Sequence, residues 1–208
     1  MSRARVAATD WDRYYRSTPF TAHLTRRYTG NVLTAALQRY GGDSIETLVE
    51  IGGANSCFLD RIRREIAPRE YHVVDTNAYG LSLLEGRGVE THLQDCRALT
   101  LQLEADVVFS IGLIEHFDSA DTARAVAAHF DLLKPGGCAI ISYPTPTWLY
   151  RAARTVTETL VAWKFPDERP LDRGEVLRAA EAHGELLFEK VLWPIVFTQR
   201  MMVFRKRA

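Results

Sequence analysis

The residues that could do chemistry lie just after short apolar segments. The segment at 47–51 (TLVEI) is followed by a tight turn at 52–56 (GGANS) and then by apolar residues at helical spacing. A strand, a glycine turn and a helix in this order make room for a nucleotide-like ligand at the carboxyl end of a strand in an open α/β sheet. Glycine is used there because a bulky Cβ would keep the ligand away from the backbone.

Two ionisable residues follow later apolar segments. Asp75 stands 23 residues after Gly52, where an acid can accept hydrogen bonds from both hydroxyls of a ribose. His116 follows the segment at 106–111, and its unperturbed pKa suits proton transfer near neutral pH. The alternatives are a simple turn acid for Asp75 and a histidine that caps or packs the next helix for His116.

The elements that would position these residues alternate between strands and helices. Apolar segments predict strands at 47–51, 71–75, 89–93, 106–111, 138–142, 186–193 and 195–204. Helical spacing predicts helices at 24–40, 58–66, 79–86, 118–133, 147–163 and 172–183. Because strands and helices alternate, we expect an α/β fold with a mostly parallel sheet and helices on both faces.

The composition is that of an ordinary globular protein. With 208 residues, 47% of them hydrophobic and 25% charged, one domain over 1–208 is expected. The formal net charge is zero, which argues against a nucleic-acid binder with a broad basic surface. The first ten residues, MSRARVAATD, lack the apolar run of a signal peptide, and no stretch reaches the ~18 apolar residues of a membrane span. We therefore expect a cytoplasmic protein that does not enter membranes.

Metal and disulfide chemistry are not expected from the spacing of cysteines and histidines. Cys57, Cys96 and Cys138 are too far apart for a disulfide framework or a zinc motif. Glu115 lies beside His116, but the other histidines show no ligand spacing. They are His23, His72, His92, His129 and His183. We therefore predict no metal site.

The combined signals resemble the class I S-adenosylmethionine-dependent methyltransferases, and small bacterial members in particular. The resemblance is carried by VEIGGANS at 49–56, VVD at 73–75, QDC at 94–96, DVVFSIGLIEHF at 106–117 and LLKPGGCAIISYPTP at 132–146. They stand in the order of the family, and EHF followed by LKPGG is the most specific part. The resemblance implies a doubly wound, seven-stranded, Rossmann-like sheet that is mostly parallel and has an antiparallel last strand.

The glycine turn departs from the family in one respect. Ala54 and Ser56 stand where the family usually has a second and a third glycine. If position 54 takes a positive φ, alanine is strained there by about 1 kcal/mol or more. Asn55 tolerates left-handed φ better than most residues, so it is expected to absorb the bend.

The resemblance implies S-adenosylmethionine as the cofactor. By resemblance, Glu50 faces its methionine end and Asp95 accepts a hydrogen bond from the adenine amino group, while the Cys96 backbone N–H donates to the ring. A buried structural acid and a simple loop acid are the alternatives for these two carboxylates. The candidate cofactor-binding residues are Glu50, Gly52, Gly53, Ala54, Asp75, Thr76, Asp95, Cys96, Ser110, Ile111 and Gly112, the last three through backbone that flanks the sulfonium.

The implied reaction is an in-line displacement in which an O, N or C nucleophile attacks the methyl group. Such an enzyme works mainly by alignment, and a neutral hydroxyl or protonated amine acceptor also needs a base. His116 is the first candidate, followed by Tyr14 and Tyr15. The N-terminal segment 1–40 is expected to form a lid, although its aromatic rings could simply dock on the sheet rim. Residues 143–180 complete the acceptor side.

The expected function is methyl transfer to a small molecule, either a specialised metabolite or a sugar, by a monomer or homodimer without nucleic acid. One alternative is a nicotinamide-dependent oxidoreductase on a related fold. Such an enzyme is expected to carry a complete GxGxxG turn, which the chain lacks. The other alternative is a non-catalytic scaffold that retains the fold. The replacement of two family glycines by Ala54 and Ser56 favours this alternative.

Overall fold

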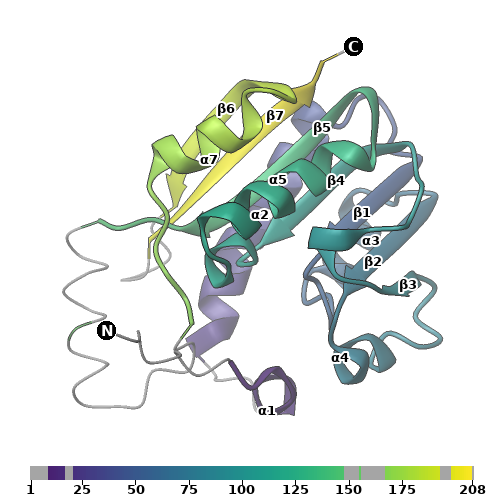
Figure 1. The fold of residues 1–208 in the computed structure, drawn as a ribbon. Helices are drawn as coiled ribbons and strands as arrows, with labels where there is room; N and C mark the ends of the chain where they lie inside the picture. Colours follow the sequence, from purple (N-terminus) through teal and green to yellow (C-terminus); the bar gives the residue numbers. More distant parts are fainter. Residues whose placement is uncertain (1–8, 17–20, 148–154, 156–166, 193–197, 208) are drawn as a thin grey trace.

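Seven strands form one mixed sheet in the computed structural model, which describes residues 9–16, 21–147, 155, 167–192 and 198–207 (Figure 1). The strands are β1 (Thr47–Ile51), β2 (Glu70–Asp75), β3 (Glu90–Leu93), β4 (Ala105–Ile111), β5 (Leu133–Pro144), β6 (Gly184–Leu192) and β7 (Gln199–Lys206). Their order across the sheet is β3-β2-β1-β4-β5-β7-β6. Neighbours from β3 to β5 run parallel, while β7 is antiparallel to both β5 and β6. The predicted seven-stranded, mostly parallel sheet with an antiparallel last strand is confirmed.

Helices and 3-10 turns precede the first strand or lie between later strands. They are α1 (Trp11–Arg16), α2 (Thr21–Tyr40), α3 (Leu59–Glu65), α4 (Ala78–Ser82), α5 (Ser119–Asp131) and α7 (Arg173–Ala180), with 3-10 turns η1 (Cys96–Ala98) and η2 (Ile114–His116). Asp118 begins α5 because its side chain accepts a hydrogen bond of 2.9 Å from the Asp121 backbone N–H. The helix predicted at 147–163 lies outside the described residues, apart from its first residue and Thr155.

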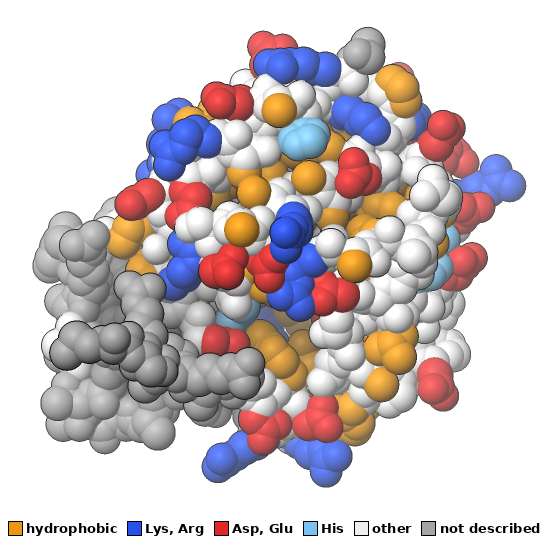
Figure 2. All heavy atoms as spheres, in the orientation of Figure 1, with side chains coloured by type: hydrophobic (Ala, Val, Ile, Leu, Met, Phe, Trp, Pro, Cys, Tyr) orange, Lys and Arg blue, Asp and Glu red, His pale blue; other side chains and the backbone are white. Residues whose placement is uncertain are grey.

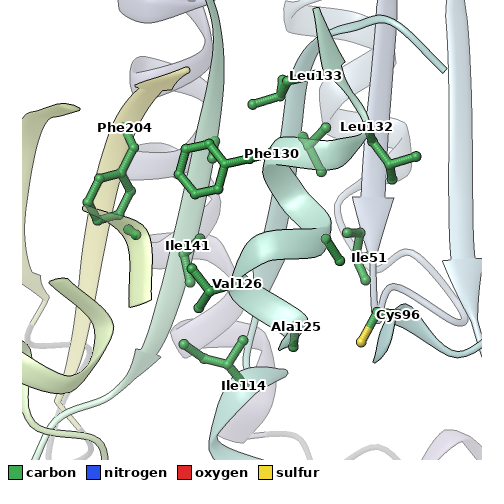
Figure 3. Packing of buried hydrophobic residues seen from close by; sticks show 14 of the residues in the cluster. Ile51, Cys96, Ile114, Ala125, Val126, Phe130, Leu132, Leu133, Ile141 and Phe204 are labelled. Carbon is green, nitrogen blue, oxygen red and sulfur yellow. The ribbon is translucent and has the colours of Figure 1, made fainter. Parts of the chain in front are cut away.

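Both faces of the sheet are buried. Val49 and Ile51 belong to an apolar cluster completed by α5 and α7 (Figure 3), whereas Leu48 and Val73 belong to a second cluster completed by α2 and α3. Because side chains alternate along a strand, adjacent residues of β1 serve opposite clusters. Helices therefore cover both faces, as predicted.

The visible surface carries both signs of charge. Acidic and basic side chains are interspersed over the face seen in Figure 2, in keeping with equal numbers of the two over the whole sequence. Among the described residues, no helix combines the length and the apolar character that a membrane span requires.

Phe130→Ala tests the core. Phe130 is 1% exposed, and its ring lies 6.1 Å from that of Phe204, centroid to centroid. Removing a buried ring leaves a cavity, so the free energy of unfolding in urea should fall by about 3–5 kcal/mol. The control is Leu93→Ala, because Leu93 is 61% exposed and surface changes usually stay within about 0.5 kcal/mol. Equal losses for the two variants would contradict this description of the core.

Candidate active site

A hollow lies at the carboxyl ends of β1 and β2, beside the segments that follow β3 and β4. It is lined by Ile51, Gly52, Val74, Asp75, Thr76, Gln94, Asp95, Cys96, Arg97, Leu113 and Phe117. The hollow thus lies next to the switch point of the sheet, where β1 is flanked by β2 on one side and β4 on the other. Ligands of open α/β sheets bind at such points.

Five predicted cofactor residues line this hollow: Gly52, Asp75, Thr76, Asp95 and Cys96. The other six predicted residues are not in its lining. They are Glu50, Gly53, Ala54, Ser110, Ile111 and Gly112. Sequence reasoning missed Arg97, Leu113 and Phe117, although Arg97 stands only two residues after Asp95.

Gly52 is required by both its backbone and its surroundings. Its φ is +73°, in the left-handed region that side chains rarely adopt, and its N–H donates to the Val74 carbonyl at 2.8 Å. A Cβ at this position would lie 2.8 Å from the Cδ1 atom of Leu113. Gly52 therefore lets the turn fold back against both β2 and the segment after β4.

The condition for strain at Ala54 is not met, and the expectation that Asn55 absorbs the bend is wrong. Neither residue has a positive φ; the bend falls on Ser56, whose φ is +39°. A left-handed φ costs a non-glycine residue roughly 1–2 kcal/mol. Ser56 offsets this cost because its hydroxyl donates a hydrogen bond of 2.5 Å to Oε2 of Glu50, which glycine could not make.

Glu50 makes the contacts expected of a buried structural acid, which is the alternative to a cofactor-binding role. It is 4% exposed and also accepts a hydrogen bond of 2.6 Å from the Tyr71 hydroxyl. Burial raises the pKa of Glu50 to about 7, although the hydrogen bonds from Ser56 and Tyr71 oppose that rise. Its place at the methionine end of a cofactor stays a prediction.

Asp75 ties the glycine turn to the end of β2. One carboxylate oxygen accepts a hydrogen bond of 2.9 Å from the Ala54 N–H, and the other accepts one of 2.8 Å from the Asn77 N–H. Burial raises the pKa of Asp75, and these backbone hydrogen bonds oppose the rise. Each carboxylate oxygen has two lone pairs, so Asp75 keeps acceptor capacity for a ligand in the hollow.

Arg97 holds Asp95 against α5. Its guanidinium donates to both Asp95 oxygens, with a shortest separation of 2.5 Å, and donates to Asp121 at 2.7 Å. The hydrogen bonds from Arg97 lower the pKa of Asp95. The guanidinium carbon also lies 5.0 Å from the centre of the Phe117 ring. This geometry fixes Asp95 at the edge of the hollow as a carboxylate.

His116 lies against the N-terminal segment. Its Nδ1 atom is 3.2 Å from an oxygen of Asp167, and its ring meets that of Trp11 edge-on at 5.1 Å. Asp167 in turn accepts hydrogen bonds from the backbone N–H and the hydroxyl of Thr9. Burial lowers the pKa of His116, although the charge of Asp167 opposes the change. His116 is therefore an oriented histidine that is neutral at neutral pH.

Burial raises the pKa values of Glu115 and Tyr15. Glu115 is 3% exposed, and burial raises its pKa well above the ordinary range, with a further contribution from Glu168. Burial also raises the pKa of Tyr15, and the charge of Asp75 adds to the rise. The Tyr15 hydroxyl thus keeps its proton at neutral pH. The roles of Tyr14 and Tyr15 as second base candidates stay predictions.

The helix α1 lies near the glycine turn. Trp11 stacks on Tyr15 with ring centres 6.0 Å apart, and the Tyr15 ring reaches Gly80 of α4, where a Cβ would lie 3.1 Å from it. The same Cβ would lie 2.5 Å from that of Ala54. The aromatic segment therefore packs against α4 beside the glycine turn. Its role as a lid stays a prediction, with docking on the sheet rim as the alternative.

The residues at the end of β4, 110–112, do not line the hollow with their side chains. Ser110 is fully buried, and its hydroxyl contacts Nε2 of His129 at 2.9 Å, away from the hollow. Gly112 has a φ of +74°, and its N–H donates to the Ser142 carbonyl at 2.8 Å. The predicted contact of the main chain of residues 110–112 with a cofactor stays a prediction.

One comparison with known proteins identifies a family. Residues 20–186 match the sequence profile of a family described as a methyltransferase domain. No curated protein sequence matches the chain.

Several solved structures share the fold. Magnesium protoporphyrin IX methyltransferase from Synechocystis PCC 6803, with bound S-adenosylhomocysteine, is 12% identical, with a TM-score of 0.74 over 95% of this chain and 94% of that one. The N-methyltransferase NodS from Bradyrhizobium japonicum WM9, also with S-adenosylhomocysteine, is 12% identical, with a TM-score of 0.67 over 94% and 92%. A putative sarcosine dimethylglycine methyltransferase from Galdieria sulphuraria is 13% identical, with a TM-score of 0.68 over 86% and 85%.

The raised pKa of Glu50 predicts a pH-dependent stability. Between pH 4.5 and about 7 the folded chain keeps a proton on Glu50 that the unfolded chain loses, so stability falls as the pH rises through this range. The contribution is on the order of 3 kcal/mol. In urea denaturation at pH 4.5 and 7.5, raising the pH should cost the wild type more stability than it costs Glu50→Gln, because only the wild type carries the Glu50 carboxyl. The same pH dependence in both proteins would mean that Glu50 does not titrate in this way.

Proposed function

The chain belongs to the methyltransferase family whose profile matches residues 20–186, and we propose that it methylates a small-molecule acceptor. S-adenosylmethionine is the methyl donor: two methyltransferases of this fold were crystallised with its product, S-adenosylhomocysteine. The observation that carries the proposal is the hollow beside the switch point, whose lining combines the carboxylates of Asp75 and Asp95 with apolar side chains.

The residues around the hollow fit an adenosyl group. Asp75 keeps lone pairs for two ribose hydroxyls after its bonds to Ala54 and Asn77. Ile51, Val74, Leu113 and Phe117 supply apolar surface for a base. Gly52 leaves the backbone open where the chain turns. The proposed cofactor site consists of these residues with Asp95, Cys96 and Thr76, and with the backbone from Ser110 to Gly112 beside the sulfonium.

The bound cofactor supplies an electrophilic methyl group that an O, N or C nucleophile displaces in line. The protein contributes chiefly by holding the two reactants in contact and aligned. The N-terminal segment, whose aromatic rings pack against α4 beside the glycine turn, would help to exclude water. Together with residues 143–180 it would enclose the acceptor.

His116 is the proposed general base. Its imidazole is neutral at neutral pH because of burial, so it can accept a proton from the acceptor as the new bond to the methyl group forms. Asp167, 3.2 Å away, would orient the ring and stabilise the imidazolium that results. Activity should therefore fall on acidification, when His116 becomes protonated.

The proposed acceptor is a specialised metabolite or a sugar, and the protein would act in the cytoplasm as a monomer or homodimer. Zero net charge supports an acceptor other than nucleic acid. The family match sets aside the nicotinamide-dependent alternative. A scaffold without activity would bind no S-adenosylhomocysteine even at millimolar concentration, which calorimetry can test.

Asp75→Asn tests the cofactor site. The change removes the charge that would accept from the ribose hydroxyls, so S-adenosylhomocysteine binding should weaken by about 1–3 kcal/mol. Isothermal titration calorimetry measures the affinity, with Asp131→Asn as the control because Asp131 is exposed at the end of α5. An unchanged affinity in Asp75→Asn would remove Asp75 from the site.

His116→Asn tests the base. With an acceptor that must lose a proton, kcat at neutral pH should fall by about 10²–10⁴-fold, while the affinity for S-adenosylhomocysteine stays within a factor of two. The measurement is the release of S-adenosylhomocysteine across a panel of small alcohols, phenols, sugars and amines. A variant that keeps the wild-type rate on every acceptor turned over would exclude His116 as the base.

A further inference from the structure

Three potential metal ligands meet at the β3 edge of the sheet, away from the hollow. His72 lies in β2, and Glu90 and His92 lie in β3. One ligand atom from each lies within 4.8 Å of the other two. His72 stands three residues before Asp75, or roughly 10 Å along an extended strand, so this group is separate from the proposed cofactor site.

The parallel register of β2 and β3 brings the three side chains together. His72 is paired with Glu90, and Val74 with His92. Because side chains at i and i+2 share a face of a strand, His72, Glu90 and His92 all project from the same face of the sheet. The spacing of these residues along the chain could not reveal this, since their contact depends on which strands pair and in which register.

The distances suit one tetrahedral ion. Nδ1 of His72 lies 3.0 Å from Nε2 of His92 and 3.4 Å from Oε2 of Glu90. Bonds of 2.0–2.2 Å to a tetrahedral Zn²⁺ would set its ligand atoms about 3.3–3.6 Å apart. The two imidazole nitrogens, which lie at hydrogen-bond distance, would therefore separate by a few tenths of an ångström to hold the ion. The two imidazole centres are 5.3 Å apart, and about 5 Å is expected for two imidazoles on one such ion.

The surroundings supply the other features of a metal site. His72 is buried, and its second nitrogen, Nε2, is buried without a hydrogen bond but lies 3.8 Å from a Glu70 oxygen. A carboxylate behind a ligating histidine commonly orients the ring. The Glu90 side chain is 68% exposed, which gives an ion access from solvent and room for a water ligand.

We propose that His72, Glu90 and His92 bind a divalent transition-metal ion of the zinc class, with water completing the coordination. Two imidazoles and one carboxylate form a ligand set that suits zinc.

The ion would join β3 to β2. Since β3 has only four residues and forms the edge of the sheet, this link would also steady Gln94, Asp95 and Cys96, which follow β3 and line the hollow. The proposal replaces the sequence-based expectation of no metal site.

The test is calorimetric titration of Zn²⁺ into the full chain, free of any histidine tag and stripped with a chelator. The wild type should bind one Zn²⁺ per chain at this site. His92→Gln should weaken binding by more than the 10–100-fold typical for loss of a supporting group, and Glu70→Gln by about tenfold. Glu90→Gln changes an exposed ligand side chain and should also weaken Zn²⁺ binding. This variant tests the site even if His92→Gln fails to fold.

Two control variants test whether Zn²⁺ binds at this cluster or at other side chains of the same types. His183→Gln and Glu85→Gln change a histidine and an exposed glutamate outside the cluster, and both should bind Zn²⁺ as the wild type does. Zn²⁺ should raise the Tm of the wild type and of both controls, but not that of His92→Gln. Absence of binding in the wild type, or the same affinity in the wild type, His92→Gln and Glu90→Gln, would overturn the proposal.

Discussion

The carboxylate of Asp75 is the contact on which the site depends. It joins the glycine turn after β1 to the first residues after β2, because its two oxygens accept backbone hydrogen bonds from Ala54 and Asn77. The parallel pairing of β1 with β2, and the hydrogen bond from Gly52 to Val74, bring the two loops within reach. The Asp75 side chain thereby holds together two segments that line the hollow, and it keeps lone pairs for a ligand.

The turn itself shows how a chain can lose glycines and keep a bend. The left-handed conformation falls on Ser56, and the hydroxyl that glycine would lack is bonded to the buried Glu50. Tyr71 from β2 donates to the same carboxylate oxygen. The departure from the family pattern is therefore accommodated by a polar cluster beneath the turn, so Ala54 and Ser56 give no reason to expect a collapsed site.

Much of the fold could be predicted from the sequence because the relevant signals are local. Apolar segments marked the strands, and the family resemblance supplied the number of strands and the antiparallel last one. Residues adjacent to a strand end, such as Asp75 and Asp95, could be placed at the hollow for the same reason. Features that depend on contacts between distant segments could not be foreseen: Arg97 bridging to Asp121 on α5, Asp167 behind His116, and the pairing that brings His72 to Glu90 and His92. The location of the positive φ was also missed, because it follows from the packing of Glu50 beneath the turn.

The most direct measurement of the central claim is a crystal structure of the protein with S-adenosylhomocysteine. We predict both ribose hydroxyls within hydrogen-bond distance of the Asp75 carboxylate, the adenine between Phe117 and the segment after β3, and the sulfur directed toward His116. A structure in which the ligand lies elsewhere, or in which Asp75 makes no contact with the ribose, would contradict the account.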